Sequence, residues 1–577
     1  MSATIWERLG ALESYAPGSL ATVKRRHHQL VVIRTATGDI FALDNRCPHE
    51  GYPLAQGDLK DCSLTCAWHN WKFDVRDGSC VLGGEDVRQY PVRIRDGEVE
   101  ADLTDPPAAS TWLSTSASLE RALHVGDTGR ALRDAARLLH AGYDARGLLT
   151  DVARYDALHG EFGSTHVLAL AADCARLLRQ QTGAAALATI APVLDLCVDT
   201  NARLPLRPAP APRTGATREG FRAAVEAEDK ESAEAFLRGA FEAGMPRREI
   251  EDWLYSVVAD HFLDFGHALI YLVKASALLD GRGNDEVSRD ILTGLAYGIV
   301  LGTREDRLPY LRGYFARVQP YSGDFGRIDT RPPTGDWNGS VLRDAVLDGS
   351  AAEAIDAVWA ALTDGAGAEA AAGELVAAAA HRLLRFDARW ESDPEVAENW
   401  LWATHRLTFA SAVRHAVRRM HDASRLQFLF QAAAFIHSGR PMDAPAASTS
   451  STSATPAAVS IPLLMESIEA RRSEDAVAIA RALLADEASW VPLQRQLEAL
   501  ALSDRFVLPI VVTHAIKTTL AAIDERDALR DHPDRDVPLL GAIRFLASPV
   551  RERDLQMQVQ RSLQWVVDGK VPRKLTQ

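Results

Sequence analysis

The stretch Cys47–His69, CPHEGYPLAQGDLKDCSLTCAWH, decides the class of the N-terminal part of this chain. It contains a Cys-x-His pair, Cys47 and His49, and a Cys-x-x-His pair, Cys66 and His69, with 16 residues between the pairs. Two thiolates and two imidazoles in this pattern are the ligand set of a 2Fe–2S cluster in which one iron takes two cysteines and the other takes two histidines. Zinc ribbons and fingers instead pair Cys with Cys and His with His. The stretch therefore predicts an iron–sulfur cluster that moves single electrons, rather than a zinc site.

The residues around the two pairs agree with a cluster site. Gly51, Leu54 and Gly57 follow the first pair, as a tight ligand loop requires. Aromatic residues near the second pair are expected to shield it, and these are Trp68, Trp71 and Phe73. Short β-rich runs separated by turn residues surround both pairs and predict strands.

Residues 6–103 resemble a Rieske-type ferredoxin domain. The resemblance rests on Cys47-Pro-His49-Glu-Gly51, Cys66-Ala-Trp-His69 and Phe73-Asp-Val-Arg-Asp-Gly78. It implies a small all-β domain whose 2Fe–2S cofactor is held by Cys47, His49, Cys66 and His69. High-potential respiratory Rieske proteins add a disulfide between the ligand loops, at positions that match Tyr52 and Trp68 here. Neither residue is cysteine, so the resemblance implies the soluble ferredoxin or oxygenase type.

Length and composition limit the remaining possibilities. A chain of 577 residues is too long for one core, so several domains are expected. Six cysteines, two of them assigned to iron, fit a reducing cytoplasm. A net charge of −14 argues against a nucleic-acid partner. The sequence has no signal peptide and no uninterrupted apolar run of about 18 residues, so no membrane association is expected.

After Pro107 the composition changes to Ala, Leu, Arg and Glu with helical spacing. We therefore predict a multidomain protein, with an all-β domain over residues 1–107 and an all-α domain over 108–577. Residues 122–159 align with 224–261 without gaps, which predicts degenerate helical repeats. About four repeats are expected, over 118–205, 220–318, 341–440 and 460–570. Residues 442–458 form a low-complexity linker.

Polar residues recur at two places in these repeats. The first place holds His159, His261, His381 and Asp504, and the second holds His166, His267, His405 and His514. Glycines between the paired histidines predict that one helix ends and another begins there, so that both imidazoles reach one ion. Glu161 and Asp264 are candidate carboxylate ligands beside them. Histidines and carboxylates inside helical bundles build many iron sites. We therefore predict a second site for non-haem iron, mononuclear or binuclear; the alternative is that these histidines only hydrogen-bond between helices.

The helical region also resembles the questin oxidase-like family over residues 110–570. The resemblance rests on His159-Gly-Glu-Phe-Gly-Ser-Thr-His166 and on Asp260-His261-Phe-Leu-Asp-Phe-Gly-His267. That family is associated with oxidative ring opening of polyketide quinones, and the resemblance implies an oxygenase. The substrate itself is not readable from the sequence.

A fused electron carrier normally serves the domain to which it is attached. We therefore expect an oxidoreductase in which the cluster delivers electrons to the second iron site, for oxidation of a small organic substrate by O2. No Gly-x-Gly-x-x-Gly motif follows a predicted strand, so a separate NAD(P)H-dependent ferredoxin reductase is the expected electron donor. Nothing after residue 107 shows the strand alternation of the usual ring-hydroxylating oxygenases. The alternative function is an electron carrier whose metal-free helical scaffold docks a separate oxygenase.

Overall fold

The structure is a computed structural model that describes residues 4–179, 181–334, 337–393, 396, 399–445, 459–548 and 555–570. The chain divides into two compact units. The first unit contains residues 1–122 and 129–142, and the second contains 123–128 and 143–577. The predicted fold class is confirmed, because a small all-β domain is followed by a large helical region.

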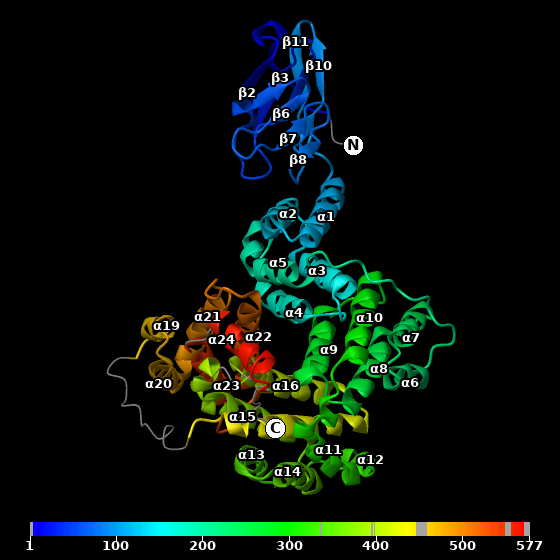
Figure 1. Ribbon diagram of the computed structural model, residues 1–577, viewed down its shortest axis with the longest axis vertical. Coiled ribbons are helices and arrows are strands. Elements are labelled where there is room, and N and C mark those ends of the chain that lie inside the picture. The colour runs from blue at the N-terminus through cyan, green and yellow to red at the C-terminus, as the bar shows by residue number, and fades with distance from the viewer. Residues whose placement is uncertain are drawn as a thin grey trace. The chain divides into compact units, whose positions relative to one another are not determined.

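The strands of the first unit form three antiparallel sheets (Figure 1). They are β1 (Trp6–Ala11), β2 (Ser19–Arg25), β3 (His28–Arg34), β4 (Ile40–Asp44), β5 (Asp58–Lys60), β6 (Ser63–Thr65), β7 (Lys72–Asp74), β8 (Cys80–Leu82), β9 (Gln89–Tyr90), β10 (Val92–Arg95) and β11 (Glu98–Asp102). The strand orders are β1-β11-β10, β2-β3-β4-β9 and β5-β6-β7-β8.

Strand β3 separates two hydrophobic clusters within this domain. Val31 and Ile33 belong to one cluster, and Leu30 and Val32 belong to the other. Successive side chains of a strand point to opposite faces, so a strand that is apolar at every position needs cover on both faces. The first cluster also contains the two predicted cysteine ligands, so the ligand loops are anchored in the hydrophobic core.

Two helices belong largely to the first unit, α1 (Ala108–Val125) and α2 (Thr128–His140). The indole Nε1 of Trp112 donates a hydrogen bond to the carbonyl of Ala141 at 3.0 Å. The change from strand to helix falls between Asp102 and Ala108, beside the predicted boundary at residue 107. The compact unit nevertheless extends to residue 142, because side chains of α2 contact the β-domain. Such tertiary contacts leave no mark on local composition.

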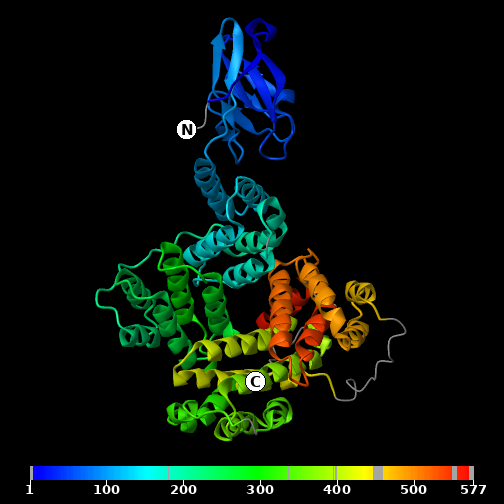
Figure 2. The ribbon, with the colours of Figure 1, turned by 180° about the vertical axis from the view of Figure 1, so that it is seen from behind.

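The second unit consists of helices (Figures 1 and 2). Its first α-helices are α3 (Ala145–His159), α4 (His166–Leu178), α5 (Leu187–Asn201), α6 (Arg218–Glu226), α7 (Lys230–Glu242), α8 (Arg247–Asp260), α9 (His267–Leu278) and α10 (Glu286–Leu301). The next are α11 (Pro309–Ser322), α12 (Phe325–Asp329), α13 (Gly339–Asp348), α14 (Ala351–Thr363), α15 (Ala368–Arg385), α16 (Trp400–Arg419) and α17 (Gln427–His437). The last are α19 (Ile461–Glu469), α20 (Ser473–Leu484), α21 (Trp490–Ala501), α22 (Pro509–Ala528), α23 (Val537–Leu546) and α24 (Leu555–Val566).

Four helices meet at the centre of this unit. Helix α4 packs on α9 and α22, and α16 packs on the same two helices. Most residues of α16 and α22 are buried, which is typical of central helices surrounded by protein. Each of the four carries one histidine of the second recurring place, and each lies in a different predicted repeat. The repeat boundaries themselves stay a prediction, and residues 446–458 of the predicted linker lie outside the described residues.

One segment differs from the expectation that no membrane-spanning segment exists. Gly183–Asn201 is long and apolar enough to cross a membrane by length and composition alone, with a mean hydropathy of 1.4. Its α5 part packs against α3, α4 and α22. A core helix of a globular unit passes the same test, so the segment is weak evidence for a membrane span.

Candidate metal centres

The first centre is built on two similar loops of the β-domain. After β4, the N–H of Gly51 donates to the carbonyl of Cys47 at 2.7 Å. After β6, the N–H of Asn70 donates to the carbonyl of Cys66 at 3.2 Å. Gly51 has φ +79° and Asn70 has φ +60°, a left-handed conformation that glycine and asparagine adopt most easily. Each tight turn therefore presents one Cys and one His on a short loop.

The four predicted ligands converge between these loops. The thiols of Cys47 and Cys66 are buried and close enough to interact, and burial raises the pKa of Cys47 to about 11. The Nδ1 atoms of His49 and His69 face each other at 3.2 Å. Two inner thiols and two outer imidazole nitrogens match the donor set of a 2Fe–2S cluster with unlike irons. These residues therefore fit the predicted cofactor.

Aromatic rings surround the outer part of this centre. The ring of Trp71 stacks on His49, with centroids 4.8 Å apart. Tyr52 and Trp68 stack on each other at 4.2 Å, so an aromatic contact joins the two ligand loops at the positions compared above with the disulfide of respiratory Rieske proteins. The expectation that Trp68 shields the site holds poorly, since this side chain is 56% exposed. The shielding comes from Trp71 and from Phe73, which is buried.

The sequence analysis missed a contact between α2 and the first ligand loop. Glu85 is buried and accepts charged hydrogen bonds from Arg133 and Arg137, both at 2.5 Å. Arg137 also lies 3.3 Å from the carbonyl of Pro48, between Cys47 and His49. No local pattern predicts these contacts, because Arg137 and Pro48 lie 89 positions apart and the two arginines lie about fifty positions from Glu85.

The fold and the donor set together define an iron–sulfur electron-transfer domain. The family model described as Rieske [2Fe-2S] domain matches residues 5–91, and through this part the chain belongs to that family. The anthranilate 1,2-dioxygenase ferredoxin subunit of Burkholderia cepacia is 31% identical over 100 residues, which is 17% of this chain and 92% of that protein. The ferredoxin component of the p-cumate 2,3-dioxygenase system of Pseudomonas putida is 30% identical over 102 residues, 17% of this chain and 86% of that protein.

A longer relative is matched only in part. The 4beta-methylsterol monooxygenase of Methylococcus capsulatus is 30% identical over 132 residues. The match covers 21% of this chain and 36% of that protein. The chain thus spans about a third of that relative's length, and the activity of the whole chain has to be argued from its own residues.

The second centre lies where α4, α9, α16 and α22 meet. It consists of His166, His267, His405 and His514, here called the histidine cluster. The Nε2 of His405 lies 2.7 Å from the Nε2 of His267 and 3.3 Å from the Nε2 of His514. His166, His267 and His405 each offer a ring nitrogen within 4.8 Å of the others. The structure therefore brings together all four histidines of the second recurring place.

The outer nitrogens of these rings are held by acceptors. The Nδ1–H of His405 donates to the carbonyl of Leu401 at 2.6 Å, and the Nδ1–H of His514 donates to the carbonyl of Ile510 at 2.8 Å. The ring of His267 is hydrogen-bonded to the backbone carbonyl of Asp264. A carbonyl only accepts, so the rings of His267, His405 and His514 carry their protons on the side away from the centre. Nδ1 of His166 pairs with the hydroxyl of Tyr271 at 2.9 Å.

The four rings are neutral at ordinary pH. Burial, together with the positive charge of Lys517, lowers the pKa of His267 to about 3. The same causes lower the pKa of the other three rings well below the ordinary value. The Nε2 atoms of His267, His405 and His514 are therefore unprotonated, and that of His405 lies beside the other two. This arrangement is how metal-ligating histidines are oriented by their outer hydrogen bonds.

Helix ends place two of the rings. Helix α3 ends at His159 and α4 begins at His166, which confirms the predicted break. Asp156 accepts hydrogen bonds from the N–H and the hydroxyl of Thr165, the N-cap of α4. Gly266 precedes α9 with φ +87°, and a Cβ there would lie 2.3 Å from the ring of Phe409 on α16. Only glycine lets α9 begin this close to α16, and the close approach brings His267 to His405.

The predicted residues of the first place lie outside the histidine cluster, which corrects the expectation that paired histidines share one ion. His159 stacks on Tyr155 and bonds to the carbonyl of Leu204. His261 bonds to Asp306 and Glu226, and His381 lies beside Asp534. The helix break turns the second histidine inward and leaves the first at the end of the preceding helix.

The predicted carboxylates are also not brought to the cluster. Asp264 accepts from the N–H of Thr303 at 2.8 Å and so holds the turn before α9. Glu161 is exposed, and Asp504 lies near Asp195, where it adds to the effect of burial in raising the pKa of that residue. Among the described residues, the group around His405 that could hold a metal contains histidines alone.

The sequence analysis also missed Lys517, one turn after His514 on α22. Burial lowers its pKa to about 7, and its Nζ is buried without a hydrogen-bond partner. The residue borders a cavity of about 710 Å³ that continues along α4, α9, α16 and α22. The sequence did carry a signal for Lys517. It is the only lysine, arginine or acidic residue within Thr513–Leu520, a part of α22 that is buried.

Proposed function

We propose that this chain is a Rieske-type oxidoreductase that oxidises a small organic substrate with O2 at an iron held by the histidine cluster. The observation that carries the proposal is that His166, His267 and His405 each offer a ring nitrogen within 4.8 Å of the others, with the Nε2 of His514 3.3 Å from that of His405. Lone pairs at 2.7 and 3.3 Å repel each other in a buried site, unless a cation lies between them. Imidazole nitrogens are ordinary ligands of iron in proteins.

We propose one iron in this site. Binuclear iron sites in helical bundles are built with several carboxylates from the same helices. The group around His405 that could hold a metal contains no carboxylate among the described residues. Four neutral rings on four helices suit a single ion and leave coordination positions for small molecules.

The 2Fe–2S cluster supplies single electrons, and the iron supplies the centre at which O2 meets the substrate. The chain buries the cysteine side of the first centre and the histidine cluster of the second, while His69 of the first centre is exposed. Cys47 and Cys66 lie in the core of the β-domain, and His405 and His514 are buried within the helical unit. A separate NAD(P)H-dependent ferredoxin reductase supplies the electrons in this proposal, in the cytoplasm. The resemblance of the helical region to the questin oxidase-like family belongs to the same proposal.

Metal analysis of the full-length protein, purified without oxygen, tests this function. We expect three irons and two acid-labile sulfides per chain. Replacement of Cys47 with Ser should abolish the sulfide and leave one iron. An unaltered protein with two irons, two sulfides and no other metal would exclude the second site.

A second function is favoured by a different observation. The two ferredoxin relatives are matched over 92% and 86% of their own lengths, so the β-domain corresponds to nearly the whole of proteins named as ferredoxins. We propose as the alternative an electron carrier whose metal-free helical unit docks a separate oxygenase. Reduction of O2 coupled to substrate oxidation by the purified chain and a reductase alone would exclude this alternative.

A further inference from the structure

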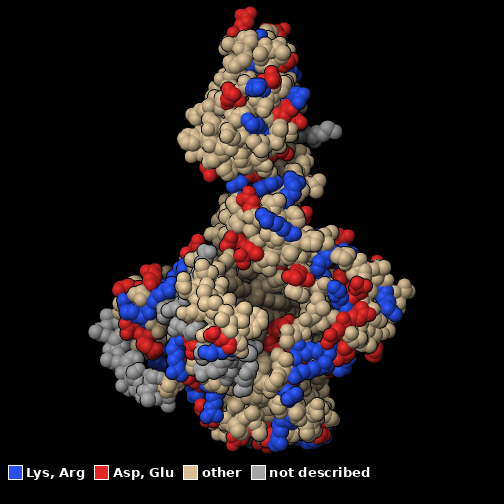
Figure 3. Space-filling view, viewed as in Figure 1, with Lys and Arg blue, Asp and Glu red and all other residues tan. Residues whose placement is uncertain are grey.

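The cavity beside the histidine cluster is lined by the same helices that carry the cluster. Asp173 follows His166 by seven residues on α4, and Lys274 follows His267 by seven residues on α9. Residues seven apart share a helix face and lie about 10 Å apart along the axis. Lys517 follows His514 by three residues and therefore lies between these two layers. The space-filling view shows the helical unit hollowed between α4, α9 and α22 (Figure 3).

The walls of this cavity combine apolar surface with an excess of positive charge. Ile270, Val273 and Ala412 contribute aliphatic surface from α9 and α16. Seven lysines and arginines line the cavity against three aspartates. A volume of about 710 Å³ is within the range of pockets that enclose small organic ligands.

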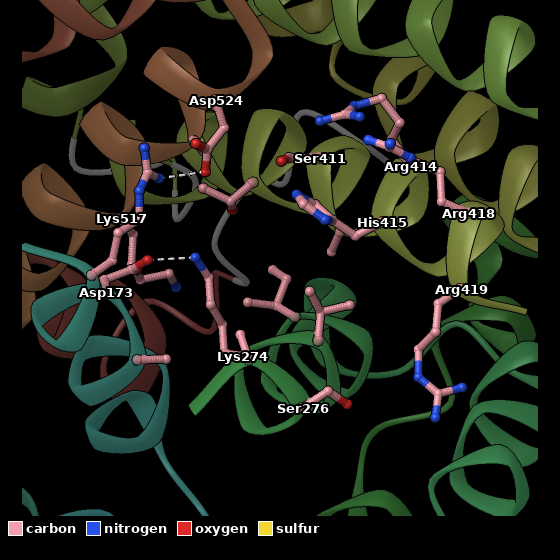
Figure 4. A pocket seen from close by; sticks show the side chains of 18 of the residues that line it. Asp173, Lys274, Ser276, Ser411, Arg414, His415, Arg418, Arg419, Lys517 and Asp524 are labelled. Carbon is pink, nitrogen blue, oxygen red and sulfur yellow. Dashed lines mark hydrogen bonds and ion pairs between the residues drawn. The ribbon is translucent and has the colours of Figure 1, made fainter. Parts of the chain in front are cut away.

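Several of the cavity's cations are already neutralised by protein groups. Lys274 pairs with Asp173 at 2.5 Å, as Figure 4 shows. Arg176 pairs with Asp524 at 2.5 Å. Arg414 is held by the buried carboxylate of Glu525 at 2.6 Å, outside the cavity lining. These pairs balance charge without a ligand.

Lys517 is different from these cations. Its side chain is 1% exposed, and its Nζ has no hydrogen-bond partner. A buried ammonium without a partner is costly, and proteins normally pair or neutralise such a group. An anion beside Nζ would provide the missing partner. Asp173 is the carboxylate that acts on Lys517, and it is paired with Lys274, so the site suits a single negative charge better than the double charge of a phosphate monoester.

We propose that the cavity binds an organic monocarboxylate with an apolar body, its carboxylate at Nζ of Lys517 and its body against α9 and α16. The inference rests on the proposed function, for which it names the substrate class. The carboxylate at Lys517 places the organic body one to two helical turns from the histidine cluster. Asp173 and Asp524 in the wall stay paired with Lys274 and Arg176.

Calorimetric titration of the full-length, metal-containing protein tests this site with two probes. The probes are 2-naphthoate and 2-naphthamide, which share a ring system and differ in charge. We expect 2-naphthoate to bind at least tenfold more tightly, because its carboxylate forms an ion pair with the ammonium whereas the amide carries no charge. Equal affinities would overturn the proposal on the unaltered protein, independently of any variant.

A lysine variant locates the charge that is responsible. Lys517→Met should reduce the affinity for 2-naphthoate by about tenfold to a hundredfold and leave the affinity for 2-naphthamide and the iron content unchanged. Removal of an unpaired buried charge is not expected to destabilise the fold. Lys230→Met, on α7 and outside the cavity lining, is the matched control and should bind both probes as the unaltered protein does.

Two outcomes separate this inference from the proposed function. Loss of 2-naphthoate binding in His405→Leu but not in Lys517→Met would mean that the metal binds the carboxylate, which overturns the role of Lys517. Two irons per chain together with Lys517-dependent binding of 2-naphthoate would refute the second iron site and support the anion site.

Discussion

His405 is the histidine on which the second metal site depends most. Its Nε2 is the shared neighbour of the Nε2 atoms of His267 and His514. Four-ligand protein sites for Zn²⁺ bind with about 10–16 kcal/mol, which is about 2.5–4 kcal/mol for each ligand. Replacement of His405 with Leu should therefore weaken metal binding by about a hundredfold to a thousandfold. The protein should then retain the two irons of the cluster and lose the third.

His405→Leu should not destabilise the fold when the second site holds no metal. Leu fills most of the volume of the ring and removes a lone pair that faces two others, so the metal-depleted variant should melt at an equal or higher temperature. A purely structural histidine would instead hydrogen-bond through its Nε2 to His267 and His514, so its loss would lower the melting temperature.

Iron analysis and thermal unfolding before and after chelation provide both readouts for this prediction. His381→Leu is the control, because His381 lies outside the cluster, beside Asp534. We expect His381→Leu to keep three irons. Three irons in His405→Leu, or a melting temperature several degrees lower in its metal-depleted form, would refute the reasoning.

Three further predictions concern residues around the two centres. Gly266→Ala should force α9 away from Phe409 and lower the iron content towards two per chain, while the visible spectrum of the cluster stays unchanged; full iron occupancy would contradict this role of the close approach. Glu85→Gln should destabilise the β-domain by about 1–3 kcal/mol and speed the bleaching of cluster absorbance on heating, because two arginines lose their carboxylate; an unchanged bleaching rate would show that α2 does not stabilise the ligand loop. Burial lowers the pKa of His261, but the hydrogen bond and the charge of Asp306 raise it, and the net result is a pKa above 6.5. The protonated His261 therefore stabilises the fold fully below pH 6.5, and this stabilisation is lost as the pH rises through the pKa of the folded state. His261→Gln should flatten the fall in denaturation midpoint above pH 6.5, and a slope identical to that of the unaltered protein would exclude this assignment.

The ligands of the iron–sulfur centre were predictable because their spacing is local. Two short loops each carry one Cys and one His, and Gly51 marks the tight turn that presents the first pair. The contact of Arg137 with the carbonyl of Pro48 was not predictable, since it depends on how a later helix packs. A ligand set that lies within short loops can be recognised from sequence, whereas a contact between distant elements cannot.

The histidine cluster was predicted in part. Glycines before His166 and His267 correctly indicated helix starts, and recurrence singled out His405 and His514. Recurrence alone could not show that the second recurring place faces the centre and the first does not, because His159 recurs in the repeats in the same way as His166. That distinction depends on the direction in which each ring leaves its helix.

The sequence by itself determined that an electron-transfer module of Cys47, His49, Cys66 and His69 precedes a helical region, because local spacing and periodicity carry that information. Only the tertiary structure decided that four helices from four distant segments bring His405 to its neighbours and leave Lys517 unpaired beside a cavity. Packing decides such features, since a side chain's burial and partners depend on residues more than a hundred positions away.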